Sequence, residues 1–189
     1  RTRERFQVLV DAQSGAILRR QNLTRFISDA TYNVYTSDSP SPFSPSLPSP
    51  ATTQPPLVNR VMVTWPALDV TASPNGWIND GDNETRGNNT DTFLDRDFDA
   101  QPDGQRPQGN PTRVFDFPLD LTQDPVIYTN AAMVQMFYKV NYYHDALYQL
   151  GFTESAGNYQ LDNFGRGGSG NDEIISYVHE YPSNHYPWR

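Results

Sequence analysis

One segment constrains the fold more than any other, because its apolar residues recur at helical spacing. The residues that recur every three or four positions, as on one face of an α-helix, are Met133, Met136, Phe137, Val140, His144, Leu147 and Leu150. Thr129 or Asn130 can cap the start of such a helix, and Gly151 follows as a natural C-terminal stop. The sequence therefore predicts one long amphipathic helix over about 130–150.

The N-terminal residues have the pattern of a β-hairpin. Residues 6–10 predict a strand, residues 11–15 a turn, and residues 16–18 the start of the return strand. Gly15 supplies the positive φ that such a turn often needs. An isolated hairpin is marginally stable in water, so we expect this one to need a larger sheet whose other strands are missing from this chain.

The remaining strands are predicted to be short and separated by long loops. Residues 58–65 and 114–117 are the best strand candidates of the middle of the chain, and residues 174–178 predict a strand near its end. The rest of 58–126 is rich in Asp, Asn and Gly and has the composition of long surface loops. One long helix among short strands indicates an α+β fold.

A proline-rich segment divides the chain. Seven of the 16 prolines lie between Pro40 and Pro56, among serines and threonines, which favours extended conformers without a core. We therefore predict a β segment over 1–36, a linker over 37–57 and a second domain over 58–189. The linker is either a simple spacer or an exposed segment that proteases can cut. We expect the sequence to be part of a longer protein.

Composition excludes several classes of function. The net charge of −8 and the pI near 4.7 argue against binding to nucleic acid or to anionic membranes, which both need a basic face. There is no cysteine, so disulfides, thiolate chemistry and cysteine-bound metals are excluded. No run of about 18 apolar residues, the length needed to span a membrane, occurs.

Four aspartates in the middle of the chain are candidate calcium ligands. Asp95, Asp97, Asp99 and Asp103 alternate as the carboxylates of a calcium loop do. Ala100, however, stands where such a loop has its turn glycine, and no acidic residue closes the loop. A solvated acidic loop is the default interpretation, and calcium is the alternative.

The three histidines do not form a zinc site. His144 falls within the helical apolar stripe, where a lone histidine is usually a structural residue that hydrogen-bonds a neighbour such as Asp145. Zinc peptidases use His-Glu-x-x-His, with both histidines on one face of a helix. His179 is followed by Glu180, but the next histidine is His185, and a helix through both would be broken by Pro182. No zinc ligand is therefore expected in this chain.

Three stretches resemble the fungalysin family of secreted zinc metalloendopeptidases. The first is Thr-Arg-Gly-Asn-Asn at 85–89, followed by an acidic loop and Val-Phe-Asp-Phe-Pro at 114–118. The second is the helix that ends Asn-Tyr-Tyr-His-Asp at 141–145 and continues to Gly-Phe-Thr-Glu at 151–154. The third joins Gly-Asn-Tyr-Gln at 157–160, Asn-Phe-Gly-Arg-Gly-Gly at 163–168 and Gly-Asn-Asp at 170–172. Together they cover roughly residues 60–175, in the order and spacing of that family.

The resemblance implies a place for each segment. Residues 1–36 look like the end of the family's inhibitory β propeptide. Residues 58–189 look like the incomplete N-terminal part of the catalytic domain, with a fold similar to part of a thermolysin-like N-terminal subdomain. The sequence departs from the family pattern after about Ser176. His144 and Asp145 match a family pair that lies away from the zinc ligands.

The resemblance also implies a function. The full-length protein would be a secreted, extracellular zinc metalloendopeptidase precursor that hydrolyses peptide bonds, with its own propeptide and protein substrates as partners. Zinc-bound water would attack the scissile carbonyl, with a Glu as base. This chain alone is predicted to be inactive. The alternative is a non-catalytic extracellular binding module that kept the scaffold, and a downstream His-Glu-x-x-His would favour the enzyme.

Overall fold

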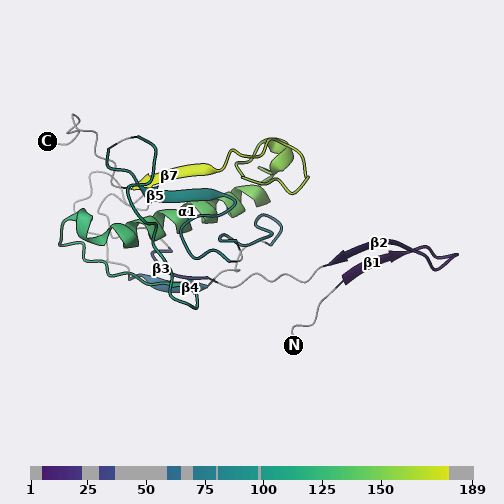
Figure 1. The fold of residues 1–189 in the computed structure, drawn as a ribbon, viewed down its shortest axis with the longest axis horizontal. Coiled ribbons are helices and arrows are strands. Elements are labelled where there is room, and N and C mark those ends of the chain that lie inside the picture. The colour runs from purple at the N-terminus through teal and green to yellow at the C-terminus, as the bar shows by residue number, and fades with distance from the viewer. Residues whose placement is uncertain are drawn as a thin grey trace.

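The computed structural model describes residues 6–22, 30–36, 59–64, 70–79, 81–97 and 99–178, and within them the fold is α+β as predicted (Figure 1). The elements in chain order are β1 (Phe6–Val10), β2 (Ile17–Asn22), β3 (Thr31–Val34), β4 (Val61–Thr64), β5 (Thr90–Leu94), β6 (Val114–Phe115), the 3-10 helix η1 (Pro125–Tyr128), α1 (Thr129–Gln149), the 3-10 helix η2 (Glu154–Ala156) and β7 (Ile174–Val178).

The predicted hairpin is formed by β1 and β2, which pair antiparallel from Phe6 opposite Asn22. Asp11 builds the turn between them, because its Oδ1 accepts hydrogen bonds from the backbone N–H of Gln13 at 3.0 Å and of Ser14 at 2.6 Å. These donors favour the ionised carboxylate, with Ser14 the largest contributor, and so lower the pKa of Asp11. Gly15 follows with φ +70°, as this turn requires.

Helix α1 lies between two small sheets (Figure 1). On one side β5 and β7 pair parallel, from Thr90 opposite Ile174 to Leu94 opposite Val178. On the other side the strand order is β4-β3-β6, with β3 antiparallel to β4 and parallel to β6. The helix contacts β3, β5 and β7, so it links the two sheets.

An aromatic cluster fills the space between α1 and β3. Tyr32 is fully buried and stacks on Phe115, with ring centroids 5.4 Å apart, while Trp77 meets Tyr138 edge-on at 5.5 Å. Burial raises the pKa of the Tyr32 hydroxyl. Aromatic pairs of this kind add to the free energy gained from the buried area. The high aromatic content therefore serves the core that joins the helix to the strand.

The ends of α1 differ in how well they were predicted. Gly151 is the predicted stop: its N–H donates to the carbonyl of Tyr148, and the N–H of Phe152 donates to that of Leu147, a Schellman ending. The predicted caps Thr129 and Asn130 are wrong. The N-cap position belongs to Tyr128, without a side-chain cap, because η1 runs directly into the helix and the capping aspartate, Asp124, lies before η1.

Only some residues of the predicted apolar stripe of the helix are buried. Met133, Phe137 and His144 are buried, but Met136, Leu147 and Leu150 are exposed. The buried face instead includes polar residues, which the apolar period could not select: Asn141 and Asp145 are both fully buried. Helix α1 therefore has one mixed face against the sheets and a second apolar face on the surface.

The middle of the chain is more ordered than its composition predicted. Within the expected loops, Thr90–Leu94 forms β5, and four of its five residues are buried. The hydroxyls of Thr90 and Thr92 lie 3.2 Å and 2.7 Å from the Ser176 hydroxyl on β7. These polar side chains are buried because they bond across the sheet. The other middle strands are shorter than predicted, since β4 spans only Val61–Thr64 and β6 only Val114–Phe115.

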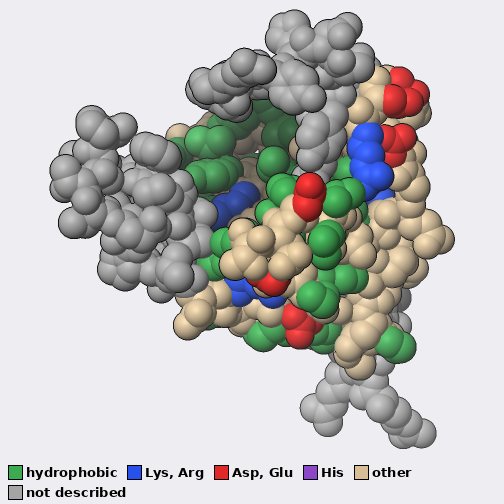
Figure 2. Space-filling model, turned by 90° about the vertical axis from the view of Figure 1, so that its left-hand side faces the viewer, with side chains coloured by type: hydrophobic (Ala, Val, Ile, Leu, Met, Phe, Trp, Pro, Cys, Tyr) green, Lys and Arg blue, Asp and Glu red, His purple; other side chains and the backbone are tan. Residues whose placement is uncertain are grey.

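Some predicted features fall outside the described residues. They include the linker over 37–57 and the histidines His179 and His185. Among the described helices, none combines the length and the apolar character that a membrane span requires. The surface does carry apolar groups: on the face drawn in Figure 2, hydrophobic side chains gather around a hollow in which a Lys or Arg side chain is visible.

Candidate functional site

A buried carboxylate on α1 organises the side of the helix that faces β5. Asp145 is fully buried and accepts three hydrogen bonds: from Ser73 Oγ at 2.6 Å, from Trp77 Nε1 at 2.9 Å and from the ring of His144 at 3.1 Å. Three donors are what a buried carboxylate needs, because an unpaired buried charge is very costly. Asp145 thereby fixes the loop at 71–78 to the second half of α1.

His144 lies beside Asp145 with its side chain 3% exposed. A carboxylate oxygen is an acceptor, so we assign the proton of this contact to Nδ1 of His144. The other ring nitrogen, Nε2, is buried and has no hydrogen-bond partner among the described residues. An imidazole that positions a neighbouring side chain matches this geometry, and a structural role for His144 and Asp145 stays our prediction.

Buried amides extend this network away from Asp145. Asn89 Nδ2 donates to Ser73 Oγ at 2.9 Å and to Asn141 Oδ1 at 3.0 Å. Gln160 Nε2 donates to Asn89 Oδ1 at 3.3 Å and to the carbonyl of Ala72 at 3.2 Å. We call Ser73, Trp77, Asn89, Asn141, His144, Asp145 and Gln160 the polar core. It ties together segments that lie far apart in the sequence, so its members position one another.

A second buried acid lies after α1. Glu154 is 2% exposed and accepts hydrogen bonds from Tyr148 Oη at 2.9 Å and from Arg166 Nη1 at 3.1 Å. Partial burial, with the bond to Glu154, raises the pKa of Tyr148. Arg166 Nη1 also donates to the carbonyl of Thr71 at 2.7 Å. Residues 165–170, which we call the glycine-rich loop, hold Arg166 and are thus fixed to the end of the helix.

An ion pair stands next to the acidic loop. Arg106 donates from Nε and Nη2 to the two carboxylate oxygens of Asp91 at 2.6 and 2.7 Å. The two side chains are 14% and 9% exposed, and the guanidinium also lies 5.3 Å from the centre of the Phe93 ring. Arg106 therefore anchors the far end of the acidic loop to β5.

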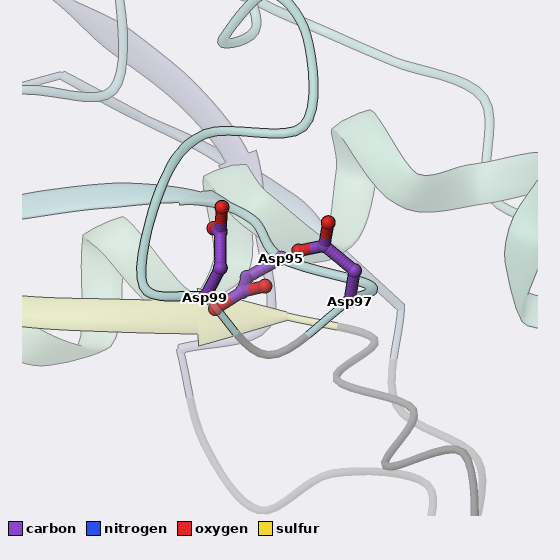
Figure 3. Close-up of side chains that lie close together, drawn as sticks. All are labelled: Asp95, Asp97 and Asp99. Carbon is purple, nitrogen blue, oxygen red and sulfur yellow. The ribbon is translucent and has the colours of Figure 1, made fainter.

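The structure brings three of the four predicted calcium ligands together (Figure 3). Asp95, Asp97 and Asp99 each offer a carboxylate oxygen, and these oxygens lie within 4.8 Å of one another. Asp95 is buried and the other two are exposed. Asp103 does not belong to this group, since its Oδ2 instead accepts the backbone N–H of Arg96 at 2.5 Å.

At Ala100 the backbone takes a left-handed conformation, which a calcium loop usually reserves for its glycine. Ala100 has φ +61°, in the left-handed region, and its N–H donates to Asp95 Oδ2 at 3.0 Å. Alanine is strained there by roughly 1–2 kcal/mol. A calcium loop has an acidic ligand at position 12, which, counted from Asp95, is Arg106 here. Arg106 is not an acid, and its side chain hydrogen-bonds Asp91. The loop therefore offers fewer ligands than a complete calcium loop.

The carboxylates of the loop repel one another. Desolvation is the largest cause that raises the pKa of Asp97, and the carboxylates of Asp99, Asp103 and Asp95 raise it further. Like charges held together disfavour the ionised form, and a cation would relieve that repulsion. Calcium prefers six to eight oxygen ligands, so water would have to supply part of the shell.

The described residues do not fit zinc. Zinc peptidases hold the metal with three protein ligands, usually including histidine. The described part of the chain holds one histidine, His144, whose Nδ1 is bound to Asp145. The one group of three metal-ligating side chains found there is all aspartate, and carboxylates alone suit calcium or magnesium. His179 and His185 lie outside the described residues.

Sequence reasoning missed most of the polar core. It selected His144 and Asp145, but not Ser73, Trp77 or Asn89. One signal was present: Asn141 is a polar residue in the helix interior, four positions after Phe137 and four before Asp145, and so on the buried face. The partners on other segments carry no local pattern.

Comparison with known proteins gives the chain its relatives. A family model described as Fungalysin metallopeptidase (M36) matches residues 47–184. The chain is 36% identical over 160 residues to extracellular metalloproteinase 5 of Trichophyton tonsurans, covering 82% of this chain and 24% of that protein. It is 36% identical over 159 residues to extracellular metalloproteinase 10 of Coccidioides posadasii, covering 82% and 23%.

A third relative matches a shorter stretch more strongly. The extracellular metalloproteinase mep of Aspergillus flavus is 42% identical over 111 residues, which cover 57% of this chain and 18% of that protein. The chain thus spans about a quarter of the length of the curated relatives it matches, or less.

Proposed function

Because this chain belongs to the fungalysin metallopeptidase family, M36, we propose that it is a segment of a secreted zinc-dependent metalloendopeptidase precursor that hydrolyses peptide bonds of extracellular proteins. The family match over 47–184 is the observation that carries the proposal. The relatives' names, extracellular metalloproteinases, support both secretion and the use of a metal.

The proposed contribution of this chain is a scaffold and not the zinc ligands. The polar core and the aromatic cluster fix α1 against both small sheets, so they would hold one side of the catalytic domain rigid. Residues 58–189 form the N-terminal part of that domain in this proposal. Residues 1–36 form the end of the propeptide, which would be a partner of the domain, and the segment 37–57 links the two.

We also propose that the acidic loop binds calcium, with Asp95, Asp97 and Asp99 as ligands. The proximity of their oxygens and the left-handed turn at Ala100 support it. Because the folded-state pKa of Asp97 is raised, the metal-free loop loses stability as pH rises through that pKa. Calcium should therefore raise the melting temperature at pH 7 and have less effect at acidic pH, where Asp97 is protonated.

Replacement of one ligand tests the calcium site. Asp97→Asn should raise the melting temperature of the metal-free full-length protein at neutral pH and remove the response to calcium. Asp120→Asn is the matched control, since Asp120 is an exposed aspartate outside the loop. An unchanged calcium response in Asp97→Asn would refute the site.

Activity of the full-length protein tests the main proposal. The protein that contains this chain should be secreted and, once its propeptide is removed, should hydrolyse casein, and a zinc chelator should abolish the activity until zinc is restored. Its sequence should contain a His-Glu-x-x-His outside these 189 residues. A secreted protein without hydrolysis and without that motif would instead be the non-catalytic binding module.

A further inference from the structure

The exposed side of α1 carries an apolar stripe that nothing in the described structure covers. Its exposed members are Met136, Tyr143, Leu147 and Leu150, with 38, 59, 45 and 83% of their surface accessible. Half-buried Val140 lies between the first two. The positions recur at spacings of four and three, which places them on one face of a helix over about 21 Å.

This stripe differs from the solvent-facing side of an ordinary helix. A surface helix normally presents charged and polar residues to water. Helix α1 contains only two charged residues other than histidine, Lys139 and Asp145, and Asp145 is fully buried. In a chain with a net charge of −8, the exposed face thus carries no carboxylate. A contiguous apolar face of this kind, with Lys139 at its edge as the one cation of the helix, marks an interaction surface.

The length of the relatives bears on what could cover the stripe. The chain spans about a quarter of their length, so most of a protein of this family lies outside it. Two sides of α1 are already occupied by β5–β7 and by β3. We infer that the stripe docks against the downstream part of the same polypeptide, beyond residue 189, through apolar side chains that make α1 a central helix in the complete domain.

The inference rests on the proposed function in one respect, namely that this chain belongs to a longer peptidase. The proposed function and the docking of the stripe can be refuted independently. Hydrolysis of casein tests the function, whereas protection of the stripe tests the docking, and a full-length protein without activity could still show a covered stripe.

Methionine oxidation measures the coverage without any substitution. Met136 belongs to the stripe, and Met133, one turn away, is 2% exposed and serves as the buried control. In the folded full-length protein, hydrogen peroxide should oxidise Met136 about tenfold or more slowly than in urea, as it does Met133. Oxidation of Met136 near the unfolded rate, with Met133 protected, would overturn the inference.

Crosslinking identifies the occupant. A photoreactive benzoylphenylalanine in place of Tyr143 keeps an aromatic ring at the centre of the stripe. In the full-length protein it should crosslink within the same molecule to residues beyond position 189. A crosslinked product of twice the mass would assign the stripe to a second copy, and crosslinks confined to residues 1–189 or to other proteins would also refute the proposal.

A charge placed on the stripe gives the third readout. Leu147→Glu should lower the melting temperature of the full-length protein by about 4 °C or more, because the carboxylate would be buried at the interface. Leu121→Glu is the matched control, since Leu121 is 55% exposed and lies outside α1. Equal, small effects of both substitutions would contradict docking at the stripe.

Discussion

The indole Nε1 of Trp77 donates a 2.9 Å hydrogen bond to Oδ2 of Asp145, although the two residues are 68 positions apart. Both side chains are buried, Trp77 at 3% and Asp145 at 0% exposure. Trp77 also packs edge-on against Tyr138, which lies about two helical turns before Asp145. One side chain thus joins the aromatic cluster to the polar core, and the two halves of the interior depend on each other.

Trp77→Phe tests that dependence. The substitution keeps an aromatic ring but removes the donor, which leaves Oδ2 of Asp145 buried without its partner. We expect it to lower the free energy of unfolding by about 1–3 kcal/mol, measured by urea denaturation. Tyr159→Phe is the control, because Tyr159 is 49% exposed and lies outside α1, so this substitution should change the stability by less than about 0.5 kcal/mol. Similar values for the two variants would contradict the role of Trp77.

His144 is the next test of the polar core. His144→Ala removes a bond to Asp145 and leaves a cavity, so it should cost about 1–3 kcal/mol of stability. His144→Asn places an N–H donor near the position of Nδ1 and should recover part of the loss. The account is wrong if the folded full-length His144→Ala protein has normal stability but no turnover, since His144 would then act in catalysis.

Asp91 contacts two arginines that differ in exposure, so the cost of losing a buried ion pair can be compared with that of losing an exposed one. Arg106 binds Asp91 through both carboxylate oxygens and is 14% exposed, whereas Arg86 approaches it at 3.5 Å and is 53% exposed. Arg106→Gln should cost about 3 kcal/mol, because a buried carboxylate loses its main partner. Arg86→Gln should cost less than about 1 kcal/mol. Denaturation of both variants measures the difference, and equal costs would refute the distinction.

Two glycines of the glycine-rich loop have the same backbone conformation but different surroundings, so their substitutions can be compared. Gly165 and Gly168 have φ of +69° and +68°, so alanine is strained at both by about 1–2 kcal/mol. A Cβ on Gly168 would lie 1.9 Å from the carbonyl oxygen of Glu154, while one on Gly165 meets nothing within 4 Å. Gly168→Ala should therefore cost about 1–3 kcal/mol more than Gly165→Ala. No difference between their unfolding free energies would show that the loop does not pack on Glu154.

The helix and the hairpin were predictable because their signals are local. The helical period over 130–150 and the Asp11–Gly15 turn each lie within one short stretch of sequence. The α+β class and the family resemblance followed from such stretches, and both are confirmed.

The polar interior was not predictable in the same way. Thr90 and Thr92 are buried because they bond to β7, more than 80 positions away, and no pattern within Thr90–Leu94 announces that partner. The helical spacing of apolar residues likewise placed Leu147 and Leu150 on the predicted core face, and it could not include the polar residues Asn141 and Asp145. Burial of these side chains is decided by partners on distant segments, and the exposed stripe on α1 looks like core to any method that reads one helix alone.

The central claim is that this chain contributes the scaffold of a metallopeptidase but none of its zinc ligands. The most direct measurement is the zinc content and casein hydrolysis of residues 1–189, purified beside the full-length protein. We predict about one zinc per molecule for the full-length protein and chelator-sensitive hydrolysis once its propeptide is removed, and neither for residues 1–189. Zinc binding and chelator-sensitive hydrolysis by residues 1–189, lost in His179→Ala but retained in His144→Ala, would contradict the claim.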